Sequence, residues 1–127
     1  RACEKGQAIV EFALLLPVLL VLILGVLDMA RAYSVLQVVT NAAREGARAG
    51  IIPTSTAATV TATVDAYLTA AGQTGCTTTG TNMGTAGSAG DSTAVTVSCN
   101  FTALTGTLVP GWGGTFALSQ TAIMRHE

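Results

Sequence analysis

The chain has 127 residues, of which 50% are apolar, 10% are charged and 5% are aromatic, and its net charge is −1. This length fits one domain, and the charged fraction is less than half of the roughly 25% that is typical of soluble globular domains. The composition excludes an electrostatic nucleic-acid surface, which needs clustered Lys and Arg, because no basic residue lies between Arg48 and Arg125.

The first element in chain order is an apolar block over residues 8–27, which reads AIVEFALLLPVLLVLILGVL and contains one charge, Glu11. Its length is about what crosses a ~30 Å hydrocarbon layer as a helix. A secretory signal has a shorter apolar region, of about 7–15 residues, followed by a small-residue cleavage site that is not evident after Leu27. The block therefore predicts a membrane-inserted helix, in which Pro17 removes one internal hydrogen bond and introduces a kink.

The three cysteines of the chain indicate whether its C-terminal part lies in an oxidising or a reducing compartment. Cys76 and Cys99 lie in the polar C-terminal part and could form one disulfide, which requires an oxidising environment. Cys3 lies on the other side of the apolar block and is left over. The alternative is that the thiols of Cys76 and Cys99 stay reduced and pack as small apolar side chains.

The orientation of the helix is predicted from these cysteines and not from the charges. Basic residues lie on both sides of the block, namely Arg1, Lys5, Arg31, Arg44 and Arg48. Their distribution does not favour a cytoplasmic N-terminus under the positive-inside rule. A disulfide would place the C-terminal part outside, so we expect the N-terminus inside.

The start of the block resembles a class III signal of type IV pilin-like proteins. Residues 6–12 read GQAIVEF, and in such signals a prepilin peptidase cuts after a Gly and leaves a Glu at the fifth mature position. Cleavage after Gly6 would make Gln7 the first residue and Glu11 the fifth. Residues 1–6 are then a leader-like segment.

Two longer runs resemble the TadE family of pseudopilins from tight-adherence (Tad) pilus systems. They are GQAIVEFALLLPVLL at residues 6–20 and NAAREGAR at residues 41–48, and the ending AIMRHE is also similar. The resemblance covers roughly residues 6–50 and 115–127. It implies a major or minor subunit of an extracellular filament, with prepilin peptidase, the pilus assembly machinery and identical copies as partners. The implied path leads from the inner membrane to the cell surface or the filament.

A carboxylate inside a membrane span is costly and by default marks a function or a partner. The resemblance implies that Glu11 pairs with the N-terminal amine of a neighbouring subunit and so sets axial register. If residues 1–6 remain, Lys5 of a neighbour or a backbone group freed near Pro17 would have to replace that amine. The simpler alternative is that Glu11 extends to the nearby membrane interface.

The helical pattern should continue past the membrane and give one helix over residues 7–50, which ends before Pro53. Its apolar face is expected to hold Tyr33, Leu36, either Val39 or Thr40, Ala43 and Ala47, which recur at three-to-four spacing. The last turns of the helix are rich in Ala and Gly, which allows close packing.

Residues 51–127 predict a small Thr- and Gly-rich outer domain, which makes the whole chain α+β and pilin-like in layout. We expect a helix over residues 55–71, a loop or short irregular strand over 72–92, and antiparallel strands over 95–102 and 115–125. A turn-rich connector joins the last two strands. Its Trp112 either contacts a partner or covers the end of the sheet.

Neither catalysis nor a metal or other cofactor is expected. His126 is the single histidine, and we expect it to be a solvated terminal residue, so no Cys–His or Ser–His pair has a basis in the sequence. The acids of the C-terminal part, Asp65, Asp91 and Glu127, are isolated. Two other functions remain open, a membrane-retained pilus assembly factor and a membrane-anchored adhesin.

Glycosylation is judged from composition alone. The part of the chain after Pro53 has nineteen Thr residues, which makes O-linked sugars an expectation. Asn100 begins a sequon, but the alternating pattern places it in a strand, so we do not expect an N-linked sugar there.

Overall fold

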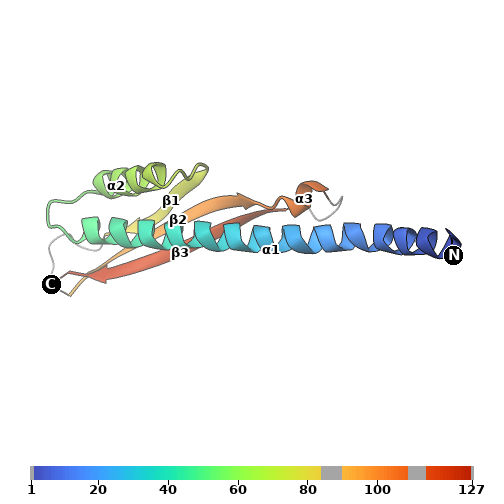
Figure 1. The fold of residues 1–127 in the computed structure, drawn as a ribbon. Helices are drawn as coiled ribbons and strands as arrows, with labels where there is room; N and C mark the ends of the chain where they lie inside the picture. Colours follow the sequence, from blue (N-terminus) through green and yellow to red (C-terminus); the bar gives the residue numbers. More distant parts are fainter. Residues whose placement is uncertain (1, 84–89, 109–113, 127) are drawn as a thin grey trace. The chain divides into compact units, whose positions relative to one another are not determined.

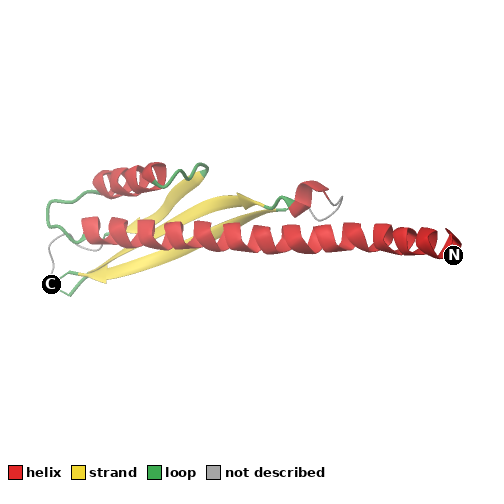
Figure 2. Ribbon diagram, viewed as in Figure 1, coloured by secondary structure: helices red, strands yellow, loops and turns green. Residues whose placement is uncertain are grey.

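The computed structural model describes residues 2–83, 90–108 and 114–126. In chain order, its elements are α1 (Ala2–Gly50), α2 (Ala57–Ala70), β1 (Cys76–Asn82), β2 (Ser92–Thr102), α3 (Thr105–Leu108) and β3 (Thr115–Arg125) (Figure 1). The sheet is three-stranded, in the order β1-β2-β3 (Figure 2). The layout is α+β, as the sequence predicts.

The contacts divide the chain into two units. One contains residues 1–31 of α1 together with residues 102–114, and is called the helix unit below. The other contains residues 32–101 and 115–127, and is called the sheet unit.

The core of the sheet unit combines the C-terminal half of α1, one face of α2 and one face of β2. Successive residues of a strand point to opposite faces, and every second residue of β2 from Thr93 to Phe101 is buried. On α2 the spacing is helical, with Val60, Val64 and Leu68 buried. The period-2 and period-3.6 patterns of the sequence therefore converge on one core.

The Thr hydroxyls of α2 are paired within the helix and its N-cap. Thr56 and Thr59 form a capping box, in which each side chain accepts the backbone N–H of the other residue. Further along, the hydroxyls of Thr61, Thr63 and Thr69 each donate to the carbonyl four residues earlier. The hydroxyls thus find partners within the helix.

Small residues let α1 approach α2 and β2 closely. A Cβ atom added at Gly46 would lie 2.5 Å from Cγ2 of Val64 and 3.1 Å from Cγ1 of Val95. One added at Gly50 would lie 2.6 Å from Cγ2 of Thr93. Real Cβ contacts of 2.5 or 2.6 Å are essentially absent from proteins, so a larger residue at either position would force Val64 or Thr93 to shift.

Two sequence expectations for this unit need correction. Tyr33 is 64% exposed, so the predicted apolar face of α1 is wrong at that end, and the fully buried face begins at Val39. β2 begins at Ser92, before the predicted start at Val95. Thr93 can lie on its buried face because its hydroxyl has hydrogen-bond partners in Gly50 and His126.

The segment over residues 72–92 contains a strand, so the strand alternative for it is right. β1 pairs antiparallel with β2, and the pairing shifts between Thr79 and Asn82, which makes the strand irregular. Trp112, expected at the end of the sheet or in a partner contact, lies outside the described residues.

Candidate assembly helix and its anchoring contacts

The apolar block of α1 is exposed around most of the helix. Leu14, Val18 and Phe12 are 71%, 66% and 63% exposed. The most apolar 18-residue window of α1 has a mean hydropathy of 2.9, and none of it is buried within the described chain. By length and composition this helix can cross a membrane. An apolar surface of this size needs a cover of lipid or protein.

Gly6, Gln7 and Glu11 all lie on α1 and are exposed. The described side chains offer the Glu11 carboxylate neither a hydrogen bond nor an ion pair. Glu11 lines a shallow surface depression together with Gly6, Gln7, Val10 and Leu14. Of these four neighbours, only Gln7 has a polar side chain. Any partner of Glu11 must therefore come from outside the described side chains.

Pro17 lies in the middle of the block, and α1 continues on both sides of it. Its ring has no N–H to donate to the carbonyl of Ala13, so the helix has one bond fewer there. The kink itself remains a prediction.

Asp28 follows the block directly and makes contacts that the sequence analysis missed. Its side chain is nearly buried, with the residue 6% exposed. One carboxylate oxygen accepts the backbone N–H of Leu104 at 2.9 Å, and the other accepts the N–H and the hydroxyl of Thr105, each at 2.8 Å. Arg31 donates to the same carboxylate at 3.3 Å.

These contacts keep Asp28 charged. The backbone N–H groups of Thr105 and Leu104 hold the pKa of Asp28 below its usual range, with smaller help from the Thr105 hydroxyl and Arg31, while burial opposes them. An ionised Asp28 thus caps the start of α3 from another element. The sequence shows an acid after an apolar block, but nothing in it points to a partner 76 residues away.

Cys76 and Cys99 lie opposite each other in the β1–β2 pairing and are joined by a disulfide. Their Cα atoms are 4.0 Å apart. Cys99 is 1% exposed and belongs to the core, so the bond fastens the edge strand β1 to the buried face of β2. The side chain of Cys3 lies outside the described part of the structure.

Reduction of this disulfide should destabilise the sheet unit. The two cysteines are 23 residues apart, and closing a loop of that size stabilises a fold by about 2–4 kcal/mol. Urea unfolding of oxidised and reduced protein, followed by circular dichroism, measures the difference. Cys3→Ser is the control and should leave the midpoint unchanged. Alkylation of both Cys76 and Cys99 in unreduced native protein would contradict the bond.

His126 is buried, contrary to the solvated terminal residue expected from the sequence. It is 5% exposed, and its Nε2 lies 2.8 Å from the hydroxyl oxygen of Thr93, which donates to the carbonyl of Gly50 at 3.3 Å. Because that hydroxyl has one proton to donate, Nε2 is the donor toward Thr93. The His126 backbone also bonds to Gly90 and Asp91. The end of the chain is thereby fixed to the last residue of α1.

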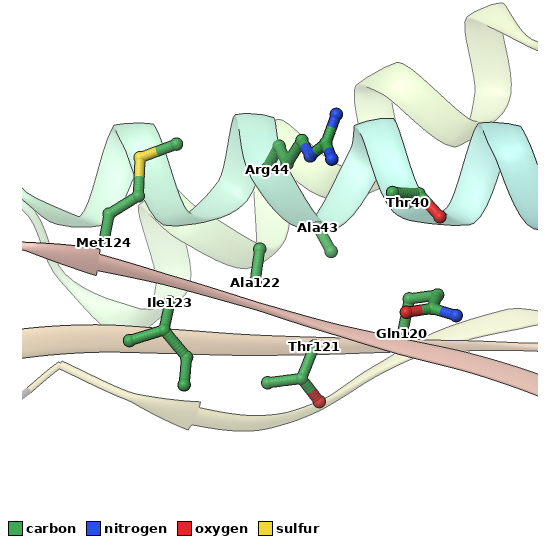
Figure 3. Close-up of a pocket in the computed structure, with 8 residues that line it drawn as sticks. All are labelled: Thr40, Ala43, Arg44, Gln120, Thr121, Ala122, Ile123 and Met124. Carbon is green, nitrogen blue, oxygen red and sulfur yellow. The ribbon is translucent and has the colours of Figure 1, made fainter.

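A groove of about 300 Å³ lies between α1 and β3 in the sheet unit, lined by Thr40, Ala43, Arg44, Gln120, Thr121, Ala122, Ile123 and Met124 (Figure 3). Figure 3 shows Gln120 and Ala122 on the side of β3 that faces α1. The lining offers one guanidinium, one amide and two hydroxyls, without a base that could activate a nucleophile. Among the described residues no group of three or more His, Cys, Asp or Glu could hold a metal ion.

The family model described as TadE-like protein matches residues 6–48. This match covers about a third of the chain. This TadE-like segment contains the whole apolar block, Glu11, Pro17, Asp28 and the tightly packed Gly46, whereas α2 and the sheet lie outside it. The resemblance noted in the sequence is confirmed for these residues and indicates a component related to Tad pili. No curated protein and no solved structure matches the chain.

Proposed function

We propose that the chain is a pilin-like structural subunit, major or minor, of an extracellular filament of the Tad and type IV pilus class. It assembles through the apolar block of α1. The observation that carries the proposal is the exposed apolar helix with a carboxylate inside it: Glu11 lies among exposed apolar side chains and has no partner among the described residues. A simple anchor needs the apolar length but has no use for that charge.

Two environments of the block follow from this proposal. Before assembly, the block spans the inner membrane with the N-terminus inside, and the disulfide-bonded sheet unit is outside, where oxidation is possible. During assembly, the block leaves lipid and packs against the same block of identical copies.

Glu11 gives the helix a preference for one axial position against a neighbouring copy, which apolar contacts alone do not give. Lipid tails are as apolar as leucine side chains, so helix contacts alone give little preference for neighbouring copies over lipid and none for one axial position. Prepilin peptidase cuts after Gly6, and the new amine of Gln7 in one copy pairs with Glu11 of the next. The pair forms only at one offset between helices, and this fixes the register.

The surface of the sheet unit suits a packed filament. Between Arg48 and Arg125 the only charged residues are Asp65 and Asp91. A free monomer at high concentration needs more surface charge to stay dispersed, whereas a surface covered by neighbouring copies or by sugars does not.

Intact mass and N-terminal sequencing of the chain in material sheared from the cell surface test the proposal. We expect the chain in that fraction, beginning at Gln7. Recovery only in the membrane fraction would contradict it and favour a retained assembly factor or an adhesin. Gly6→Leu removes the glycine after which the peptidase cuts, so this variant should keep residues 1–6 and stay in the membrane. The change should not disturb the helix, because an added side chain at Gly6 meets nothing within 4 Å. Gly25→Leu, also in open space, is the matched control and should be cut normally.

A further inference from the structure

The contacts of Asp28 fix the connector between β2 and β3 to the outer end of the apolar block. Leu27 is the last residue of the block, and Asp28 binds the backbone of Leu104 and Thr105. All of these residues belong to the helix unit. The start of the connector (residues 103–114) is therefore fastened, at Leu104 and Thr105, where the apolar block ends.

The covered face of α1 continues from Asp28 into the block. Leu24 is half-buried, while Ile23 and Val26 near it are 50% and 62% exposed. Residues four apart share a face of a helix, so Leu24 lies one turn from Asp28 on the same side. Among the described residues of the helix unit, those outside α1 that could cover this face are residues 102–108 and 114.

The polar groups at the start of α3 have protein hydrogen-bond partners, so they do not need water. The N–H groups of Leu104 and Thr105 and the hydroxyl of Thr105 all donate to Asp28. Backbone groups at membrane depth must have protein partners, because lipid offers none. Beside this bonded backbone, the Leu104 side chain is 44% exposed.

We propose that the described start of the connector, Leu104 and α3, is a lipid contact that fixes the depth of the helix in the bilayer before assembly. Leu104 and α3 lie at the boundary between headgroups and acyl chains on the outer face of the membrane, held there by Asp28. The partner is the bilayer itself, reached through apolar contact and not through charge, because residues 103–114 contain no charged residue. This inference rests on the proposed function, since it requires the block to lie in lipid.

Spin-label accessibility in vesicles tests the depth of the connector. The full chain with Cys3→Ser receives one new cysteine at a time, by Leu22→Cys, Leu104→Cys or Ile52→Cys, and each is labelled with a nitroxide without reductant. The parent side chains are 61%, 44% and 53% exposed, so burial in the chain does not separate them. Collisions with oxygen, which concentrates in lipid, and with a water-soluble nickel complex are measured in vesicles of phosphatidylethanolamine and phosphatidylglycerol.

We expect the Leu22 label to be shielded from nickel, the Ile52 label to be open to it, and the Leu104 label to be several-fold less open than that at Ile52. A Leu104 label as open to nickel as that at Ile52, with Leu22 in lipid, overturns the lipid contact and leaves the proposed function intact. A Leu22 label that is open to nickel overturns the membrane-inserted helix itself.

Asp28→Ala isolates the role of the carboxylate. In the chain labelled at Leu104, this change should raise the accessibility of the label to nickel to that measured at Ile52, because the start of α3 is no longer bound to Asp28. In the chain labelled at Leu22, the same change should leave the label shielded from nickel. Asp65→Ala removes an exposed carboxylate from α2 and should change neither label. A Leu104 label that stays shielded in Asp28→Ala shows that Asp28 does not hold the connector at the bilayer.

Discussion

Glu11→Ala should abolish filament assembly and leave membrane insertion intact. The carboxylate lies in an apolar surface and has no partner among the described side chains. Under the proposed function, its partner in the assembled state is a neighbouring copy. Loss of one member of a buried charge pair costs about 3–5 kcal/mol and leaves the other charge unpaired. Each 1.4 kcal/mol is about tenfold in an equilibrium constant. We therefore expect a loss of roughly two to four orders of magnitude in the subunit association constant.

The measurement is the ratio of the chain in sheared surface material to the chain in membranes. Glu11→Gln keeps the shape and removes the charge, and it should fail in the same way. Glu45→Ala removes an exposed carboxylate of α1 outside the block and should assemble normally. Filaments of normal yield from Glu11→Ala would remove the register role, and failure of that variant to enter membranes would show that Glu11 serves insertion.

Gly46→Ala should destabilise the sheet unit, although alanine is the better helix former by about 1 kcal/mol. The added methyl would lie 2.5 Å from Val64 and 3.1 Å from Val95, on different elements of the core. Valine has one strongly preferred rotamer in a helix, so Val64 cannot turn away without strain. Overpacking of this kind costs about 1–3 kcal/mol. Urea unfolding, with constant m-value, measures the change.

Gly25→Ala is the matched control, since a Cβ there meets nothing within 4 Å. It should be neutral or slightly stabilising. Val64→Ala removes the nearest obstacle, so the double variant Gly46→Ala with Val64→Ala should cost less than the sum of the two single changes. Equal unfolding midpoints for Gly46→Ala and Gly25→Ala would contradict the close approach of α1 to α2.

The elements with strong local patterns could be predicted from the sequence. The length of the apolar block predicts α1, and the alternation from Val95 to Phe101 predicts β2 and its buried face. The spacing of Val60, Val64 and Leu68 predicts α2. These signals are local, because each depends on the spacing of side chains along one element.

The contacts that join distant segments could not be predicted. Asp28 binds residues 76 and 77 positions later, and His126 binds Thr93 across 33 positions. No period within one element encodes such a pairing, and a terminal histidine is solvated in most proteins. For the candidate site, the sequence alone singles out Glu11. The structure adds that no described side chain forms a hydrogen bond or an ion pair with its carboxylate.

Dipolar broadening of a spin label at Leu22→Cys in a Cys3→Ser background tests the central claim most directly, because it reports whether neighbouring blocks lie close together. We predict narrow spectra from chains diluted in membranes and strongly broadened spectra from material sheared from the cell surface, where identical helices surround each label. Narrow spectra in both preparations, or a chain found only as separate copies in lipid, would contradict assembly through this helix.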